Sequence, residues 1–198
     1  INMGAIMVIG DVMLDKYVYG EVERINPEAP VPILSVKSEK EMLGGAANTA
    51  NNIASLGAPV FLVGVCGKDA DAETLEWLCK KQGISCMLLR DSERATTVKQ
   101  RFIAQPYNHQ LLRADYESAK PLQKELVRKV LDAVKKHNPS MIVISDYAKG
   151  MLTKEFVEGL KGEFKGRILV DSKPAHYGFY KGVFLLKPNL AEASQILG

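Results

Sequence analysis

The chain has 198 residues, of which 46% are hydrophobic and 25% are charged, and its formal net charge at pH 7 is +3. These values are ordinary for a soluble globular domain with a substantial core. The small charge and the lack of a Lys/Arg-rich run argue against nucleic-acid binding, and no stretch approaches the ~20 apolar residues of a membrane span. We therefore expect one cytoplasmic domain over 1–198 that binds neither nucleic acid nor membrane.

Cysteine and histidine usage argues against disulfides and against a metal centre built from these residues. Cys66, Cys79 and Cys86 are odd in number and form no C-x-x-C pair, and the three histidines are far apart in the sequence. A disulfide framework or a zinc site needs paired or closer spacing. We expect free thiols in a reducing compartment.

In the first half of the chain, a segment of polar, Pro-containing strands interrupts the apolar strands and helices. Its predicted elements in order are a buried strand at 4–11, exposed or edge strands around a Pro-rich turn within 16–41, a helix at 43–57, a buried strand at 59–67 and a capped helix at 69–83. The segment 16–41 carries prolines 27, 30 and 32 together with alternating polar residues, which is atypical of a central strand. The helices are predicted from their caps and apolar spacing.

In the second half of the chain, predicted strands and helices alternate more regularly. Its predicted elements are a strand at 84–90, a hairpin of 96–105 and 109–115 around "PYN", a helix at 121–137, a strand at 141–150, a helix at 153–164, buried strands at 167–174 and 182–189, and a helix that begins at 189. Apolar strands that alternate with helices indicate βαβ units. They predict an α/β fold with a mainly parallel sheet and helices on both faces.

Two amphiphilic segments, 16–37 and 96–114, break this alternation. We interpret part of them as a small separate β element over the carboxyl edge of the sheet, where ligands bind in open α/β folds. The chain stops at Gly198 when its last helix has barely begun. We therefore expect an incomplete domain, truncated at the C-terminus.

Candidate ligand-binding residues first occur near the N-terminus. Asp11 and Asp15 follow the first strand and could accept hydrogen bonds from ligand hydroxyls, although aspartate is also a common turn residue. "LGGAANTANNIASLG" then opens a helix with Gly44 and Gly45, which would let a ligand approach the backbone, and with Asn48, whose amide both donates and accepts. The alternative is a tight turn with surface asparagines, which we prefer for at least one of Asn51 and Asn52.

Further candidates lie at the ends of later strands. Asp146 in "SDYAKG" could lie near a metal or a sugar, or could only end a strand. Asp171, Lys173, Lys187, Asn189 and Glu192 converge if the strands of "VDSKP" and "LKPNLAE" are neighbours. Lysine could then meet phosphate and Glu192 could hold Mg²⁺, although surface lysines and an acid in a first helical turn are the simpler explanation. Neither a Walker A motif nor a G-x-G-x-x-G follows the first strand.

Several motifs together resemble the ribokinase-like carbohydrate kinase family. "GDVMLD", "GGAANTANNIASLG", "VGVCGKDADAETL" and "KPNLAE" match its order and spacing, while "ERINPEAPVPIL", "ISDYAKG" and "VDSKP" are similar to its heptose 7-phosphate kinases. The resemblance implies a three-layer αβα sandwich with a small β lid that often contributes to dimerisation. It also implies ATP- and Mg²⁺-dependent phosphorylation of the anomeric hydroxyl of D-glycero-β-D-manno-heptose 7-phosphate, on the route to ADP-heptose and lipopolysaccharide.

The resemblance also implies roles for single residues. The sugar or its phosphate would contact Asp15, Gly44, Gly45, Asn48, Arg101 and Asp115. The ATP phosphates would lie near Lys173, Lys187 and Asn189, and Mg²⁺ near Glu192, Asp146 and Asp171. The partners that the resemblance implies are thus a sugar phosphate and ATP and, through the lid, a second copy of the chain.

One family element does not occur in these 198 residues. Family members carry, after "PN..E", a Gly-Ala-Gly-Asp element whose aspartate is the catalytic base. We therefore assign no catalytic residue, expect the base C-terminal to Gly198, and expect these 198 residues alone to be inactive. The alternatives are a non-catalytic sugar-phosphate-binding module of the same fold, or a kinase of this family for another sugar or a nucleoside, such as fructose phosphate or adenosine.

Overall fold

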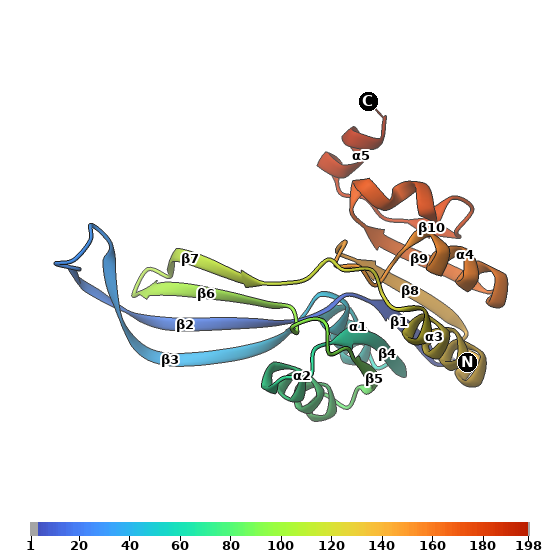
Figure 1. The fold of residues 1–198 in the computed structure, drawn as a ribbon, viewed down its shortest axis with the longest axis horizontal. Helices are drawn as coiled ribbons and strands as arrows, with labels where there is room; N and C mark the ends of the chain where they lie inside the picture. Colours follow the sequence, from blue (N-terminus) through green and yellow to red (C-terminus); the bar gives the residue numbers. More distant parts are fainter. Residues whose placement is uncertain (1–3, 198) are drawn as a thin grey trace.

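The computed structural model describes residues 4–197 and has a body built on one six-stranded sheet (Figure 1). The strand order is β10-β9-β8-β1-β4-β5, and every pairing in it is parallel. The strands are β1 (Ile6–Gly10), β4 (Val60–Cys66), β5 (Ser85–Arg90), β8 (Met141–Asp146), β9 (Arg167–Ser172) and β10 (Leu185–Leu186). Because the strands are parallel, their carboxyl ends meet at one edge of the sheet.

Helices cover both faces of this sheet. Helices α1 (Gly45–Ser55) and α2 (Ala70–Lys81) pack on one face, and α3 (Lys124–His137) and α4 (Lys154–Glu163) pack on the other. Alternation along β1 separates the two cores: Met7 and Ile9 lie in the core under α3 and α4, whereas Val8 lies in the core under α1 and α2. The predicted α/β sandwich with a mainly parallel sheet is confirmed.

A second, four-stranded sheet projects from the body (Figure 1). Its order is β3-β2-β6-β7, formed by β2 (Val12–Ile25), β3 (Pro32–Gly44), β6 (Val98–Gln105) and β7 (His109–Tyr116). Strand β2 pairs antiparallel with β3 and parallel with β6. The predicted segments 16–37 and 96–114 both fall in this sheet. We call it the projecting sheet.

One sequence-based expectation about strands was right only in part, and another was wrong. Exposed or edge strands around a Pro-rich turn were expected within 16–41, and β3 is an exposed edge strand that follows such a turn. Strand β2, however, is paired on both sides, because the prolines lie beyond it, in the turn and at the start of β3. A buried strand was expected over 182–189, but β10 is two residues long and Phe184 and Leu185 are exposed. Strand β10 pairs only with β9 and ends the sheet, so apolar character there did not mean burial.

The remaining elements lie after β9. A 3₁₀ helix, η1 (Pro174–Tyr180), follows it and was not predicted, whereas α5 (Leu190–Leu197) begins where a helix was expected. None of the helices within residues 4–197 combines the length and the apolar character needed to cross a membrane.

Candidate functional site

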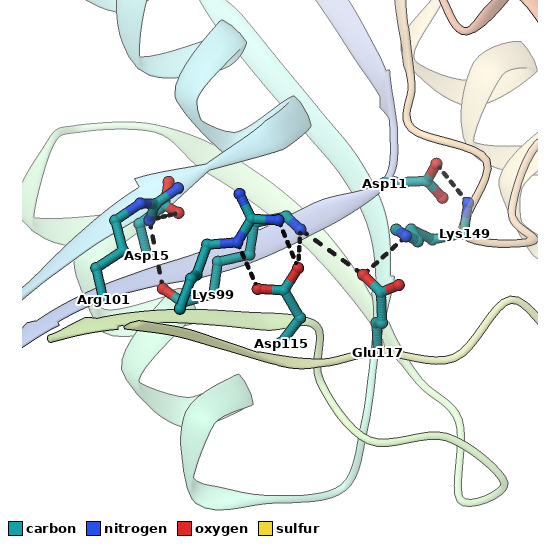
Figure 2. A network of polar contacts seen from close by, with 8 residues as sticks. Asp11, Asp15, Lys99, Arg101, Asp115, Glu117 and Lys149 are labelled. Carbon is teal, nitrogen blue, oxygen red and sulfur yellow. Dashed lines mark hydrogen bonds and ion pairs between the residues drawn. The ribbon is translucent and has the colours of Figure 1, made fainter. Parts of the chain in front are cut away.

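Polar side chains gather in two places near the carboxyl ends of the strands. The first, which we call the charged cluster, lies at the base of the projecting sheet and contains Asp15, Lys99, Arg101, Arg113, Asp115, Glu117 and Lys149 (Figure 2). The second, which we call the strand-end hollow, has a volume of about 160 Å³ and is lined by Asp146, Tyr147, Asp171, Ser172, Lys173, Lys187, Asn189 and Glu192. Together the two places hold nine of the twelve predicted site residues.

Asp15 lies where β2 leaves the body, between β3 and β6. Arg101 on β6 donates from Nη1 to Asp15 Oδ1 over 2.6 Å, and its guanidinium lies 5.2 Å from the centre of the Tyr17 ring. Gly44 lies against the other carboxylate oxygen, since a Cβ there would be 2.6 Å from Asp15 Oδ2. The Asp15 carboxylate is therefore held between one cation and a glycine whose missing side chain lets the carboxylate approach the backbone closely.

Asp115 on β7 is shared by two cations. Arg113 donates to both of its oxygens over 2.8 and 2.9 Å, and Lys99 donates to Oδ2 over 3.0 Å. These hydrogen bonds hold the pKa of the Asp115 carboxyl below its usual value. Two cations on one carboxylate leave a net positive charge, which favours an anionic ligand at this place.

The charged cluster reaches the body through Glu117. Lys99 lies 3.7 Å from Glu117 Oε2, and Lys149 in the loop after β8 lies 2.7 Å from the same atom. The hydrogen bond from Lys149 lowers the pKa of Glu117. Figure 2 shows this line of charges running from the projecting sheet to the β8 loop.

The loop after β8 is fixed by two buried aspartates. Asp11 Oδ2 accepts hydrogen bonds from the N–H groups of Tyr147 and Lys149, over 2.8 and 3.1 Å, and burial raises the pKa of the Asp11 carboxyl. Asp146 Oδ1 accepts from the N–H of Ala148 over 2.9 Å. Ala148 has a φ of 57°, a left-handed conformation that is costly for a residue with a Cβ. Both carboxylates therefore hold backbone in place.

Asp146 accepts still more hydrogen bonds at its second oxygen. Oδ2 accepts from Ser172 Oγ over 2.9 Å and from the Tyr180 hydroxyl over 2.6 Å, and His176 Nδ1 lies 2.8 Å away. The Asp146 side chain has no exposed surface. With both oxygens engaged, Asp146 organises the wall of the hollow and has little capacity left for a cation.

The other acids of the hollow are more open. Asn189 and Glu192 form a reciprocal cap at the start of α5, because each side chain accepts the other residue's backbone N–H over 2.9 Å. Lys173 Nζ lies 3.4 Å from the second Glu192 oxygen, and Lys187 Nζ lies 3.5 Å from Asp171 Oδ2. The two lysines and two carboxylates thus face one small space, as their positions at the strand ends predicted.

The opening glycine and asparagine motif has a strict structural role. Gly45 has a φ of 53°, and a Cβ there would lie 2.4 Å from the carbonyl oxygen of Asp11, so only glycine fits. Asn48 is exposed on α1 and, with Asn51, lines a different hollow of about 300 Å³ between β3, α1 and α2. The structure therefore places Gly45 beside the Asp11 backbone and Asn48 away from the residues lining the strand-end hollow.

Sequence reasoning missed four members of the charged cluster: Lys99, Arg113, Glu117 and Lys149. Three of them could have been found, because Lys99 and Arg101 on β6, Arg113 and Asp115 on β7, and Glu117 directly after β7 recur with a period of two, which places the strand residues on one side of the hairpin. Lys149 gives no such indication, since only the folded chain brings its loop beside Glu117.

The donor set limits how a metal could bind. Within residues 4–197, no group of three or more His, Cys, Asp or Glu side chains is arranged to hold a metal ion. Asp171 and Glu192 are the carboxylates of the hollow that keep oxygens accessible. Mg²⁺ commonly binds through one or two carboxylates, water and substrate phosphates, which suits this pair.

Comparisons with known proteins agree on one family. Residues 3–198 match the pfkB family of carbohydrate kinases. Among curated proteins, the chain is 39% identical over 200 residues to the bifunctional protein HldE of Nitrobacter winogradskyi, covering 98% of this chain and 41% of that protein. It is 40% identical over 197 residues to HldE of a Bradyrhizobium species, covering 96% and 40%. The chain therefore spans about two fifths of the length of these relatives.

Solved structures agree on the fold. Phosphofructokinase-2 of Escherichia coli, in its tetrameric inhibited form, superposes with a TM-score of 0.78 at 18% identity, over 98% of this chain and 64% of that chain. Ribokinase of Giardia lamblia superposes with a TM-score of 0.74 at 19% identity, over 99% and 65%. At such identities the likeness concerns the fold alone.

Proposed function

The chain belongs to the pfkB family of carbohydrate kinases, and from this premise we propose that it supplies the sugar site and part of the phosphate site of an ATP-dependent sugar kinase. The acceptor we propose is D-glycero-β-D-manno-heptose 7-phosphate, phosphorylated at its anomeric hydroxyl. The observation that carries the proposal is the pairing of two polar places near one sheet edge: a charged cluster with shared cations and a hollow with two lysines and two carboxylates.

In this proposal the charged cluster binds the sugar phosphate. Asp15 accepts hydrogen bonds from sugar hydroxyls, Gly44 and Gly45 let the chain pass close to Asp15 and Asp11, and Asn48 binds a further hydroxyl. Arg101, Lys99 and Arg113 attract the phosphate, since Asp115 neutralises only part of the charge of its two cations. Guanidinium groups suit this task because they bind phosphate oxygens in a bidentate manner.

The strand-end hollow would hold the phosphates of ATP. Lys173 and Lys187 would neutralise phosphate charge, with Asn189 at the start of α5 as a polar neighbour. Asp171 and Glu192 would hold Mg²⁺ together with the phosphates, and we leave Asp146 out because its oxygens are engaged. Bound Mg²⁺ would neutralise the charge on the transferring phosphoryl group.

Phosphoryl transfer depends chiefly on positioning and charge neutralisation. The residues above orient the acceptor and the phosphates, and the buried aspartates keep the β8 loop in place between them. A base must also take the proton of the anomeric hydroxyl, and we assign that role to no residue of this chain.

We further propose that the projecting sheet acts as a lid and pairs with a second copy of the chain. Its strands expose large apolar side chains, among them Val36, Leu112 and Tyr116. Contiguous exposed apolar side chains often mark an interface. Light scattering across a range of concentrations tests this: we expect a dimer that Leu112→Glu converts to a monomer.

Calorimetric titration with the heptose 7-phosphate tests the sugar site. We expect Arg101→Met and Arg113→Met each to weaken binding about 10- to 100-fold, because each removes a charge-assisted hydrogen bond. Lys37→Met is the matched control, since Lys37 on β3 pairs with Glu21 over 3.0 Å and belongs to no part of the charged cluster.

The same titration separates the alternatives. Tight binding of fructose 6-phosphate or adenosine in place of the heptose would assign the chain to another substrate of the family. Equal affinity for the heptose with and without its phosphate would contradict the role of the cations. ATP and Mg²⁺ added to the saturated complex then distinguish a kinase from a module that only binds the sugar phosphate.

A further inference from the structure

Tyr147 lines the strand-end hollow, although it is not among the site residues predicted from the sequence. It is the first residue after β8, and its backbone N–H donates to the buried Asp11 carboxylate over 2.8 Å. The backbone of the next residue, Ala148, is fixed in the same way by Asp146. Two buried carboxylates therefore determine the position of the loop that carries the Tyr147 ring.

The Tyr147 ring lies beneath one of the two lysines of the hollow. The Lys173 Nζ atom is over the ring, 5.5 Å from its centre. An ammonium group within about 6 Å of an aromatic ring centre is attracted by the negative face of the ring. Burial and the charges of Asp171 and Asp15 raise the pKa of the Tyr147 phenol, so the phenol carries no charge at neutral pH. The contact thus joins a cation to a neutral ring.

The Lys173 side chain is otherwise weakly fixed. Its backbone is held at the start of η1, since its carbonyl oxygen accepts the N–H of His176 over 3.0 Å. The side chain is 48% exposed, and its carboxylate partner is Glu192, whose Oε1 lies 3.4 Å from Nζ. A lysine has a flexible four-carbon stem, and an exposed ion pair contributes little. The ring is therefore a second means of keeping the ammonium at the hollow.

The two partners of Lys173 act differently on its charge. A carboxylate neutralises the ammonium, whereas an aromatic ring attracts it without cancelling its charge. In the proposed function, Glu192 would also hold Mg²⁺, and a carboxylate oxygen engaged by Mg²⁺ is a weaker partner for an ammonium group. The Tyr147 ring would then remain, and it would leave the positive charge of Lys173 available to phosphate.

We propose that Tyr147 is a positioning residue for Lys173: its ring holds the ammonium at the wall of the strand-end hollow, where the ammonium meets the phosphate groups of the ligand. The proposal deepens the proposed function and rests on it for the class of ligand. The contact between ring and ammonium belongs to the ligand-free chain, so it can be tested separately.

Nuclear magnetic resonance of the ligand-free chain tests the contact. Protons over the face of an aromatic ring resonate upfield, so we expect an upfield position for the Hε protons of Lys173, identified by their loss in Lys173→Met. Tyr147→Leu should return them to the ordinary position, whereas Tyr147→Phe, which keeps the ring, should not. Lys81, whose Nζ lies 4.9 Å from the centre of the Trp77 ring, provides the reference. An ordinary Lys173 resonance in the unmodified chain would overturn the proposal.

Calorimetric titration with Mg²⁺ and tripolyphosphate tests the positioning role. We expect Tyr147→Leu to weaken binding of this probe roughly 3- to 5-fold, as loss of one cation–ring contact would, and Tyr147→Phe to retain the affinity. In the Lys173→Met background, Tyr147→Leu should have no further effect, because the ring then has no cation to hold. Trp77→Leu is the matched control, since it removes an exposed ring with its own lysine on α2.

Three results of the titration would contradict the positioning role. Equal affinity of Tyr147→Leu and the unmodified chain would show that the ring contributes nothing to binding. A loss that persists in the Lys173→Met background would make the ring merely structural, and an equal loss in Tyr147→Phe would assign the effect to the hydroxyl. Failure of the unmodified chain to bind the probe would instead contradict the proposed phosphate site, and the Lys173 resonance would still decide whether Tyr147 holds Lys173.

Discussion

The body and the projecting sheet are stabilised in different ways. The body buries its apolar side chains between a parallel sheet and helices on both faces, and Phe156 and Ile142 are fully buried there. The projecting sheet leaves large side chains such as Leu112 exposed and carries ion pairs along its strands. Burial contributes far more per residue than an exposed ion pair does. The charged groups of the projecting sheet are therefore available for binding at little cost to folding.

The two regions nevertheless share one core. Leu14 of β2, Leu43 of β3 and Val98 of β6 are buried with the side chains of α1 and α2. Lys16 on β2 also pairs with Asp71 on α2 and with Glu41 on β3. The base of the projecting sheet is thus packed into the core of the body. The two regions differ only further along the strands, beyond these buried residues.

The sharpest test of this comparison replaces one large apolar residue in each region. Phe156→Ala in the body should lower the free energy of unfolding by about 3–5 kcal/mol, because it leaves a cavity in a packed core. Ile25→Ala at the end of β2 in the projecting sheet should change it by less than about 0.5 kcal/mol, because the side chain is 61% exposed. Urea unfolding of both variants measures this, and similar losses would contradict the comparison.

A smaller loss is expected from Arg94 and Asp91, an ion pair that is strongly buried near the loops. Arg94 and Asp91 have side chains only 6% and 5% exposed, and Arg94 also donates to the carbonyl oxygens of Lys120 and Lys149. Arg94→Met leaves the Asp91 carboxylate buried without its cation and should cost about 3 kcal/mol. Asp91→Asn combined with Arg94→Met should recover part of this loss in the same unfolding experiment.

The partly buried pair of the charged cluster should matter less for folding than the pair of Arg94 and Asp91. Asp15 and Arg101 are each about one fifth exposed, so water still reaches the pair, and it should contribute roughly 1 kcal/mol. Arg101→Met should therefore change the free energy of unfolding by no more than that, while it weakens sugar-phosphate binding strongly. A loss of stability as large as that of Arg94→Met would place Arg101 among the structural residues.

The smallest effect that we expect is on the loss of stability at low pH. The pKa of Asp115 is lower in the folded chain, so its carboxylate stabilises the fold above the unfolded pKa of about 4 and loses this contribution as the pH falls. Because the group is near the surface, Asp115→Asn should reduce the stability difference between pH 7 and pH 3 by less than about 0.5 kcal/mol. Asp91→Asn should reduce it more, since the pKa of the buried Asp91 is also lowered, by the N–H of Glu93 and by Arg94 against the opposing effect of burial.

The sequence was a good guide to the body and to the strand-end hollow. Apolar runs and caps identified its strands and helices, because burial on both faces leaves a clear pattern. Asp171, Lys173, Lys187, Asn189 and Glu192 were expected together and do line one hollow, since carboxyl ends of neighbouring parallel strands meet at one edge.

Features that depend on long-range pairing were beyond sequence reasoning. The parallel pairing of β2 with β6 places Leu14 opposite Val98, and no local pattern encodes such a partner. The same holds for Lys149 beside Glu117 and for Asp11 under the β8 loop. Helix η1 was missed because "PAHYGFY" has neither the length nor the spacing of an α-helix, and Tyr180, which donates to Asp146, was missed with it.

The position of β1 in the sheet has a consequence for the time course of folding. Strand β1 is made first but lies in the interior, paired with β4 on one side and with β8 on the other. On a ribosome, β1 can pair with β8 only after residues around 141 have emerged. In the same way, β2 can pair with β6 only after β6 has been made. During synthesis a strand whose Met7, Val8 and Ile9 are fully buried in the finished fold therefore remains unpaired on one side, and in this interval the growing chain is most prone to aggregate or to need a chaperone.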